Sequence, residues 1–402
     1  MKQFVIGILK ESKAKEHRVP LTPADAQLLL ENYPNLLIKA EPSEKRVYTN
    51  RQYTNVGVKI TDNLLDCDLL VGLKEVDIHK IIPGKTYLFF AHVAKMQHRK
   101  KSYFKQLASK KITLVDYEYL TNKNEKRIAA FGYWAGIAGL YNAFYALGKR
   151  YKTFELPLVS SFSSFNALFN KLNNLVLPPV KIIITGAGNS AKGVSDTLKK
   201  LGIKGVSQSA FLNKSFNFPV YCILSPRQFL VQKDGLPYSK ADFKANRDQY
   251  ISIFHQYAEV ADLYFACHYW ENNMPLLLTN NHLASKESRL KIVADISCDI
   301  NGPIACTLKE STIENPFYDF NPLTQNIEPA FSSPDNINVM AVGNLPTMLP
   351  FDSSNYFSDV LTKKILPHFI SEKDCEIIEN ATLLKNGQLT CAFNDLYDYL
   401  NT

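Results

Sequence analysis

Short apolar runs alternate with amphipathic stretches along the first part of the chain. Runs of this length that are bounded by turn residues are typical of buried parallel strands. A helix is predicted at residues 23–32, because Thr22 can act as its N-cap and Pro23 suits its first turn. Strands are predicted at residues 3–9, 35–40, 67–74, 85–92 and 112–117. This alternation predicts a doubly wound α/β domain.

The second part of the chain repeats this pattern after a long apolar segment. Residues 129–149 predict a helix that leaves the first domain and enters a second one, and its small residues permit close backbone approach. Further strands are predicted at 180–185, 219–224, 262–267 and 291–296, and helices at 194–201, 355–371 and 392–401. We expect this C-terminal tail to return to the first domain.

The predicted fold class is α/β, with two doubly wound Rossmann-like domains and a cleft between them. The predicted substrate domain is discontinuous and comprises residues 1–133 and 345–402. The predicted dinucleotide-binding domain comprises residues 134–344.

Two neighbouring strands of the first domain are each predicted to end in a nitrogen base. Lys74 ends the run at residues 69–74, and His92 ends the run at residues 87–92. Open α/β sheets bind ligands beyond the carboxyl ends of their strands. A lysine tuned by burial and a histidine that titrates near neutrality can share proton transfer there. The alternatives are a lysine that reaches solvent and a histidine with an internal partner.

A dinucleotide-binding loop is predicted where the strand at 180–185 runs into Gly-x-Gly-x-x-Ala and a helix. The first glycine permits a tight turn, the second lets the backbone approach a pyrophosphate, and the alanine permits helix–strand packing. The helix N-terminus then attracts phosphate. The residues concerned are Gly186, Gly188, Asn189, Ser190 and Ala191. An ordinary glycine turn is the alternative.

The acidic residue that usually follows such a loop is missing. The segment at 206–209 reads Val-Ser-Gln-Ser, so Ser207 is the candidate near the ribose and Lys214 the candidate for a 2′-phosphate. The choice between NAD and NADP stays open, with NAD slightly favoured.

Two later strand ends add candidates for the same site. Asp295 and Asp299 could face the nicotinamide, although strand-end capping explains them equally well. Cys267, followed by His268, could line the crevice, although a buried structural cysteine is the favoured interpretation.

Composition narrows the function classes. The formal net charge is +8, and the basic cluster at 95–111 predicts a solvated helix face rather than a nucleic-acid site, because no recognition motif accompanies it. The seven cysteines are scattered without a Cys-x-x-Cys pair, which indicates a reduced, cytoplasmic protein without a metal site. No apolar stretch reaches membrane-spanning length, and the N-terminus reads as a strand rather than a signal or transit peptide.

Several segments together resemble the saccharopine dehydrogenase (lysine-forming) and lysine–2-oxoglutarate reductase family, within the alanine dehydrogenase and transhydrogenase superfamily. The order of the segments is preserved over nearly the whole chain. They are a Lys-Glu start followed by Glu-His-Arg-Val-Pro-Leu-Thr-Pro (16–23), Gly-Leu-Lys-Glu (72–75), Phe-Ala-His (90–92), Asp-Tyr-Glu-Tyr-Leu (116–120), Arg-Ile-Ala-Ala-Phe-Gly-Tyr-Trp-Ala-Gly (127–136), Asp-Ile-Ser-Cys-Asp (295–299), Thr-Ile-Glu-Asn-Pro-Phe (312–317) and Asn-Leu-Pro-x-x-Leu-Pro (344–350).

The resemblance implies an NAD(P)-dependent oxidoreductase that interconverts saccharopine with L-lysine and 2-oxoglutarate by hydride transfer and imine hydrolysis. It assigns acid–base roles to Lys74 and His92, and pKa tuning of that pair to Glu75 and Glu118. Substrate binding falls to Arg18, Arg127 and Phe131, and a guanidinium fork suits a carboxylate.

One position departs from the family pattern. The family usually has an acidic residue before its Leu-Pro segment, and here that position is Gly343. A related amino-acid or opine dehydrogenase and a non-catalytic dinucleotide-binding regulatory protein are therefore kept as alternatives. The expected partner is a small amino-acid and 2-oxo-acid substrate, with no nucleic acid, no membrane, and a monomer or homodimer.

Overall fold

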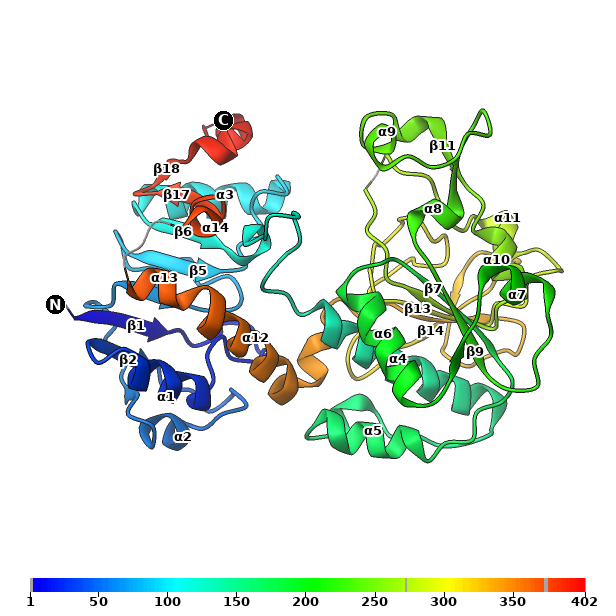
Figure 1. Cartoon of the computed structure of the whole chain (residues 1–402), viewed down its shortest axis with the longest axis horizontal. Coiled ribbons are helices and arrows are strands. Elements are labelled where there is room, and N and C mark those ends of the chain that lie inside the picture. The colour runs from blue at the N-terminus through cyan, green and yellow to red at the C-terminus, as the bar shows by residue number, and fades with distance from the viewer. Residues whose placement is uncertain (1–2, 272, 372–374, 402) are drawn as a thin grey trace. The chain divides into compact units, whose positions relative to one another are not determined.

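The computed structural model describes residues 3–271, 273–371 and 375–401. The chain forms two compact units (Figure 1). The first unit contains the residues up to Ala130 and those from Pro350 onward. The second unit runs from Phe131 to Leu349.

An eight-stranded sheet forms the centre of the first unit. The six strands β1 to β6 are parallel to one another. β17 and β18, from the C-terminal tail, extend the sheet in the antiparallel sense. The order is β18 (Gln388–Leu389), β17 (Thr382–Lys385), β6 (Thr113–Asp116), β5 (Thr86–Phe89), β4 (Leu69–Val71), β1 (Phe4–Ile8), β2 (Leu36–Ala40) and β3 (Lys59–Ile60).

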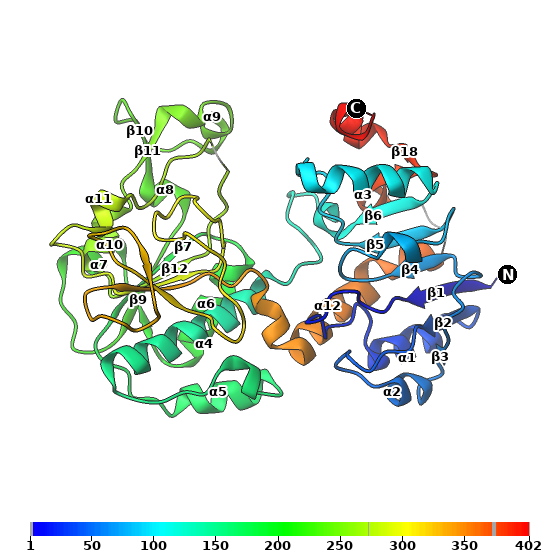
Figure 2. The same ribbon diagram turned by 180° about the vertical axis from the view of Figure 1, so that it is seen from behind.

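Helices cover both faces of this sheet. The tail helix α12 (Pro350–Lys364) packs on α1 (Pro23–Asn32), where the buried hydroxyls of Ser354 and Ser358 accept hydrogen bonds from Val19 N and Thr22 N. α3 (His98–Ser109) covers the other face (Figure 2). The remaining helices are α2 (Asn50–Thr54), α13 (Leu366–Ile370), α14 (Glu376–Glu379), α15 (Tyr397–Asn401) and the 3₁₀ turns η1 (Ile78–Lys80), η2 (Tyr117–Tyr119) and η6 (Cys391–Leu396).

The second unit also contains an eight-stranded sheet, parallel from β8 to β16. β14 and β15 extend it in the antiparallel sense, and β10 (Leu230–Gln232) pairs separately with β11 (Tyr250–Ser252). The order is β15 (Ile327–Glu328), β14 (Tyr318–Phe320), β16 (Ile337–Met340), β13 (Ile292–Asp295), β12 (Leu263–Ala266), β7 (Lys181–Thr185), β9 (Val220–Leu224) and β8 (Lys204–Gly205).

Two long helices, α4 (Gly132–Tyr151) and α6 (Asn189–Lys200), cross closely in this unit. A Cβ atom at Gly136 or Gly193 would overlap the backbone of the other helix, so glycine at these positions permits the crossing. The shorter elements are α5 (Phe165–Asn173), α7 (Gln208–Asn213), α8 (Pro226–Phe229), α9 (Lys240–Ala245), α10 (His255–Val260), α11 (Asn280–Leu283), η3 (Val159–Ser161), η4 (Arg247–Gln249) and η5 (Leu345–Met348).

The predicted α/β class with two Rossmann-like sheets is confirmed. The helix at 23–32 has the predicted bounds, and Thr22 Oγ1 caps Asp25 N. The predicted helix at 355–371 is wrong in detail, because non-helical backbone at Ile365 separates α12 from α13. The predicted helix at 392–401 begins as the 3₁₀ turn η6. Among the described residues, no helix combines the length and apolar character needed to cross a membrane.

Candidate active site

Lys74 lies in the loop that follows β4, and Glu11 holds the backbone of that loop. The Glu11 carboxylate accepts hydrogen bonds from Leu73 N at 2.6 Å and from Lys74 N at 3.0 Å. Removal of water around Glu11 raises the pKa of its carboxyl group to about 7, although these two N–H groups oppose the rise. Glu11 therefore fixes the position of Lys74 and is itself poised to titrate near neutrality.

The Lys74 amine is tuned by burial and by a neighbouring cation. Burial lowers its pKa, and the positive charge of Arg18 lowers it further, while Glu16, Glu11 and Glu75 oppose the shift. A lowered pKa increases the neutral fraction of the amine, which is the form that can accept a proton.

Arg18 forms a buried ion pair with Glu16. Its Nε and Nη2 donate to the two Glu16 carboxylate oxygens at 2.7 and 2.6 Å, and both side chains are about 1% exposed. Glu16 thus occupies the Nε–Nη2 edge of the guanidinium. The positive charge of Arg18 lies close enough to Lys74 to lower the pKa of its amine.

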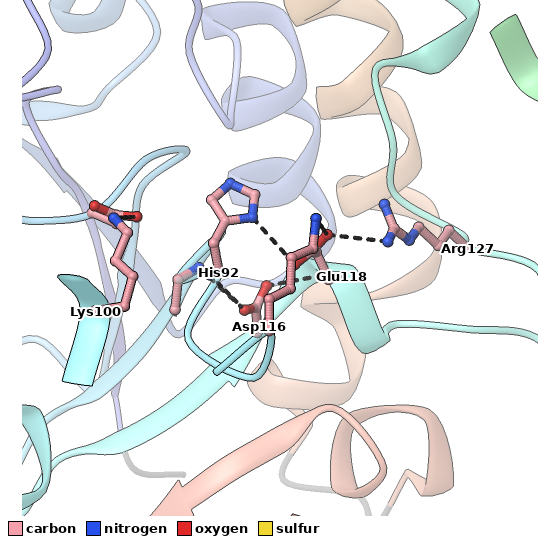
Figure 3. A network of polar contacts seen from close by, with 8 residues as sticks. His92, Lys100, Asp116, Glu118 and Arg127 are labelled. Atoms are coloured by element: carbon pink, nitrogen blue, oxygen red, sulfur yellow. Dashed lines mark hydrogen bonds and ion pairs between the residues drawn. The ribbon is translucent and has the colours of Figure 1, made fainter. Parts of the chain in front are cut away.

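β5 ends at Phe89, three residues before the predicted strand end, and His92 lies in the following loop, where a buried carboxylate from the neighbouring strand fixes it. Its backbone adopts the left-handed region with φ of 54°, a conformation that costs a non-glycine residue about 1–2 kcal/mol. Asp116 accepts hydrogen bonds from Ala91 N at 3.1 Å, His92 N at 3.3 Å and Glu118 N at 2.9 Å (Figure 3). Burial raises the pKa of Asp116 to about 6. Asp116 therefore couples the loops that carry His92 and Glu118.

Glu118 gathers the polar side chains of this cluster (Figure 3). Its carboxylate contacts His92 Nδ1 at 3.1 Å and Arg127 Nη2 at 3.0 Å, and Lys95 Nζ lies 3.6 Å away. Burial alone would raise the pKa of Glu118, but the His92 hydrogen bond and the charges of Lys95 and Arg127 bring it to about 2. An ionised carboxylate only accepts hydrogen bonds, so His92 Nδ1 carries the proton. Whenever the ring is neutral, its acceptor nitrogen is therefore Nε2.

The other predicted residues of the first unit have different surroundings. Glu75 is paired with Lys100 of α3, which ties part of the basic cluster to the site loop. The Arg127 side chain is 50% exposed and remains accessible beside Glu118. Phe131 immediately precedes α4 and belongs to the second unit.

The predicted dinucleotide loop has the geometry that a pyrophosphate needs. Gly186 has φ of +106° and donates its N–H to Leu224 O of β9 at 2.8 Å. A Cβ at Gly186 would overlap the backbone of Cys267, whereas no described atom lies within 4 Å of a Cβ built at Gly188. The first glycine is therefore required by packing, and the second leaves open space.

The N-termini of α4 and α6 meet beside this loop. A Cβ at Gly132 would lie 3.2 Å from Ser190 Oγ and 3.3 Å from Asn189 Cβ, so the first turns of the two helices are adjacent. No side-chain hydrogen bond caps either helix within the described part of the chain. Helix N-termini attract anions, and Ala191 is buried as predicted. These residues fit a dinucleotide.

Three buried polar side chains contact one another next to the loop. Thr185 Oγ1 lies 2.9 Å from Tyr264 Oη and 2.8 Å from His268 Nδ1. Burial lowers the pKa of His268 to about 4 and raises that of the Cys267 thiol. His268 is therefore neutral near pH 7, and Cys267 touches the loop through its backbone.

Strand order moves the expected ribose position away from Ser207. The direct neighbour of β7 is β9, and β8, which precedes Ser207, is the edge strand. The Ser207 hydroxyl caps α7. Lys214 accepts a hydrogen bond through its carbonyl from Lys181 Nζ, at the amino end of β7, which is opposite to the loop. The segment that adjoins the loop is instead the one after Leu224. The sequence did not predict this strand order, because the edge strand β8 has only two residues.

Asp295 supports its own loop. It is fully buried, and its oxygens accept hydrogen bonds from Ser297 Oγ, Cys298 N and Thr307 Oγ1. Asp295 therefore caps the backbone at the end of its strand, as in the alternative interpretation. Asp299 is half-buried in the same loop.

Glu11, Lys95 and Asp116 were not among the predicted site residues. Asp116 lies within the matched segment 116–120, and Lys95 lies three residues after the matched segment 90–92. The described residues contain no group of three or more His, Cys, Asp or Glu side chains arranged to hold a metal ion.

Comparisons with known proteins show what this chain is similar to. Residues 7–138 match the family model of the alanine dehydrogenase/PNT N-terminal domain. The chain is 31% identical to the alpha-aminoadipic semialdehyde synthase of Arabidopsis thaliana, over 98% of this chain and 41% of that protein. It is 24% identical to a saccharopine dehydrogenase (NAD(+), L-lysine-forming) of Yarrowia lipolytica, over 89% of this chain and 90% of that protein. The chain thus spans less than half the length of the semialdehyde synthase.

Solved structures show the same fold. An L-alanine dehydrogenase superposes with a TM-score of 0.66 at 14% identity, over 99% of this chain and 100% of that one. A transhydrogenase from Sinorhizobium meliloti has a TM-score of 0.59 at 13% identity, over 96% and 98%. The predicted resemblance is confirmed: residues 7–138 match the alanine dehydrogenase/PNT N-terminal domain, and the chain shows homology to lysine-forming saccharopine dehydrogenases and alpha-aminoadipic semialdehyde synthases.

Proposed function

We propose that this protein is an NAD(P)-dependent oxidoreductase that interconverts saccharopine with L-lysine and 2-oxoglutarate. The observation that carries the proposal is that the adjacent parallel strands β4 and β5 are followed by a lysine of lowered pKa and by a histidine whose Nδ1 is held by an ionised Glu118. Such a pair can exchange two protons at neutral pH. The names of the relatives supply the substrate class.

The residues of this chain would act in the proton transfers. A bound oxidised nicotinamide would supply the hydride acceptor for this reaction. Lys74 takes the proton of the secondary amine as that C–N bond becomes an imine. His92 Nε2, on a side chain 33% exposed, takes a proton from the water that attacks the imine carbon. Lys74 returns its proton to the nitrogen, which gives the carbinolamine. As the carbinolamine collapses and its C–N bond breaks, its hydroxyl proton passes to Lys74 and the proton held by His92 passes to the leaving nitrogen, which leaves the 2-oxo acid and the free amine.

Arg127 is proposed to bind a substrate carboxylate, because its guanidinium is accessible and Glu118 holds only one of its nitrogens at 3.0 Å. Glu118 and Glu75 are proposed to tune the two bases, and Phe131 to line the substrate site. Gly186, Gly188 and the first turn of α6 are proposed to bind the pyrophosphate.

The test is nicotinamide absorbance with lysine, 2-oxoglutarate and reduced dinucleotide. Oxidation should require both carbon substrates, and Lys74→Met and His92→Gln should each reduce kcat by about 10²-fold or more while dinucleotide binding persists. The exposed neighbours Lys80→Met and His79→Gln are matched controls. Full turnover in both site variants would refute the acid–base assignment. Turnover only with another amine and oxo-acid pair would support a related opine dehydrogenase, and binding without any turnover would support a regulatory protein.

We propose further that the dinucleotide is NADP, against the slight sequence-based preference for NAD. Leu224 O contacts the loop, and the following segment, residues 225–228, contains the exposed Arg227 and no acid. An arginine suits a 2′-phosphate, whereas a ribose diol is usually bound by an acid. Fluorescence titration should show tighter binding of NADPH than of NADH, and Arg227→Gln should remove that difference. Arg51→Gln, in the first unit, is the control.

A further inference from the structure

Gly343 lies at the carboxyl edge of the second sheet, three residues after β16 ends. It is the position at which the resemblance leads us to expect an acidic residue. The structure shows what occupies the space of the missing side chain. A Cβ built at Gly343 would overlap the Glu310 carboxylate, whose Cδ lies 2.9 Å from that Cβ position. Glycine at 343 is therefore what permits Glu310 to place its carboxylate there.

Glu310 is held in this place by the residue that follows it. Ser311 forms a parallel bridge with Val342, its N–H donates to Ala341 O at 2.7 Å, and its hydroxyl accepts from Ala341 N at 3.2 Å. Ser311 is buried, so the register between the two segments is fixed. Glu310 itself is exposed and can meet a ligand.

The same carboxylate lies near the loop that follows β13. Burial raises the pKa of Cys298 to about 12, and the negative charge of Glu310 contributes to that rise. Cys298 Sγ donates to Ala341 O at 3.2 Å, which joins this loop to the strand end before Gly343. Glu310 therefore stands at the ends of two adjacent strands, β13 and β16.

Strand order indicates which half of a dinucleotide this edge would face. In doubly wound sheets the two nucleotide halves lie on opposite sides of the switch point at the carboxyl edge. β9 and β8 lie on one side of β7, and β12, β13 and β16 lie on the other. With the ribose phosphate placed beyond β9, the nicotinamide half falls on the side of β13.

We propose that Glu310 supplies, from a different position in the chain, the carboxylate that is absent at residue 343, and that it binds a cationic group at the nicotinamide end of the site. Two cations meet this chemistry: the oxidised nicotinamide ring and a substrate ammonium group. The second of these rests on the proposed function, whereas the first requires only dinucleotide binding. Glu310 is thus a ligand-binding residue rather than a proton-transfer group.

The test moves the carboxylate between the two positions in the full chain. Glu310→Gln should weaken binding of the cationic ligand by about tenfold, as expected for a lost charge-assisted contact. Gly343→Ala should have the same effect, since its methyl group displaces Glu310. The double variant Glu310→Ala with Gly343→Asp should recover binding to within about threefold of the wild type. Glu287→Gln, an exposed glutamate of the same unit, is the control.

Calorimetric titration with oxidised dinucleotide, reduced dinucleotide and saccharopine distinguishes the two cationic groups that Glu310 could bind. Weaker binding of the oxidised form alone assigns the contact to the nicotinamide ring, and weaker binding of saccharopine alone assigns it to the ammonium group. Unchanged binding of all three by Glu310→Gln overturns the proposal. Because these titrations do not need turnover, a failure of the proposed reaction is distinguishable from a failure of this inference. If Gly343→Asp does not fold, the Glu310→Gln comparison decides alone.

Discussion

At the scale of single residues, the first unit holds two carboxylates that protein surroundings shift in opposite directions. Glu118 has its pKa lowered to about 2 because cations and a histidine surround it, and Glu11 has its pKa raised to about 7 by loss of water. The resemblance identified Glu118 directly. Glu11 could not be selected from the sequence because it acts on backbone N–H groups 62 and 63 residues away, and backbone contacts leave no pattern of residue types.

Glu118 should make the protein more sensitive to acid. Its folded pKa of about 2 lies below its ordinary value of 4.5, so it stabilises the fold above pH 4.5, and that contribution is lost between pH 4.5 and 2. The loss is at most about 3 kcal/mol. Denaturant unfolding of Glu118→Gln should show a flatter pH dependence in this range, whereas Glu125→Gln, an exposed neighbour, should match the wild type. Equal slopes in both variants would contradict the prediction.

Glu11 should have the opposite effect at higher pH. Its folded pKa of about 7 exceeds its ordinary 4.5, so the folded state binds more protons between these values. The free energy of unfolding should therefore fall as pH rises from 4.5 through 7, and the contribution is fully present only below pH 4.5. Glu11→Gln should remove this part of the slope. A slope that persists unchanged would assign the pH dependence to another group, such as Asp116.

At the scale of elements, the long apolar runs were predictable and the short or polar strands were not. The strands that became β1, β2, β6, β7, β9, β12 and β13 are predicted to within about two residues, because each is a buried run, whereas the strands predicted at 67–74 and 85–92 extend three residues beyond the ends of β4 and β5. β8 contains only Lys204 and Gly205, both exposed, and gives no apolar signal. The order of β8 and β9, on which the proposed ribose position depends, therefore required the structure.

The crossing of α4 and α6 should control the dinucleotide loop. A Cβ at Gly136 would overlap Ser190 O and lie 3.0 Å from Val194 N, so Gly136→Ala must push α6 away. We expect a destabilisation of about 1–3 kcal/mol and weaker dinucleotide binding. Gly132→Ala is the matched control, since its methyl group would meet the rotatable Ser190 hydroxyl at 3.2 Å. Thermal unfolding and fluorescence titration measure both effects, and similar behaviour of the two variants would refute the packing argument.

At the scale of the whole molecule, the proposed acid–base residues and the proposed dinucleotide-binding residues belong to two different sheets. The tail from Pro350 returns to the first unit because α12 supplies buried hydroxyls to the Val19–Thr22 loop and β17 pairs with β6. Family order predicted which segments carry chemistry. It could not predict the proposed role of Glu310, which lies 33 positions before Gly343 in the sequence. Only the pairing of Ser311 with Val342 brings the Glu310 carboxylate to the place of a side chain at residue 343.

Dinucleotide should stabilise the second unit selectively. A ligand that binds only the folded state at 100 times its Kd adds about 2.7 kcal/mol to the free energy of unfolding. NADPH should therefore raise the unfolding temperature of the transition that reports the second unit, and NADH at the same concentration should raise it less. Arg227→Gln should bring the two shifts together, because its loss removes the proposed contact with the 2′-phosphate. Equal shifts by NADPH and NADH in the wild-type protein would instead show that Arg227 does not select the cofactor.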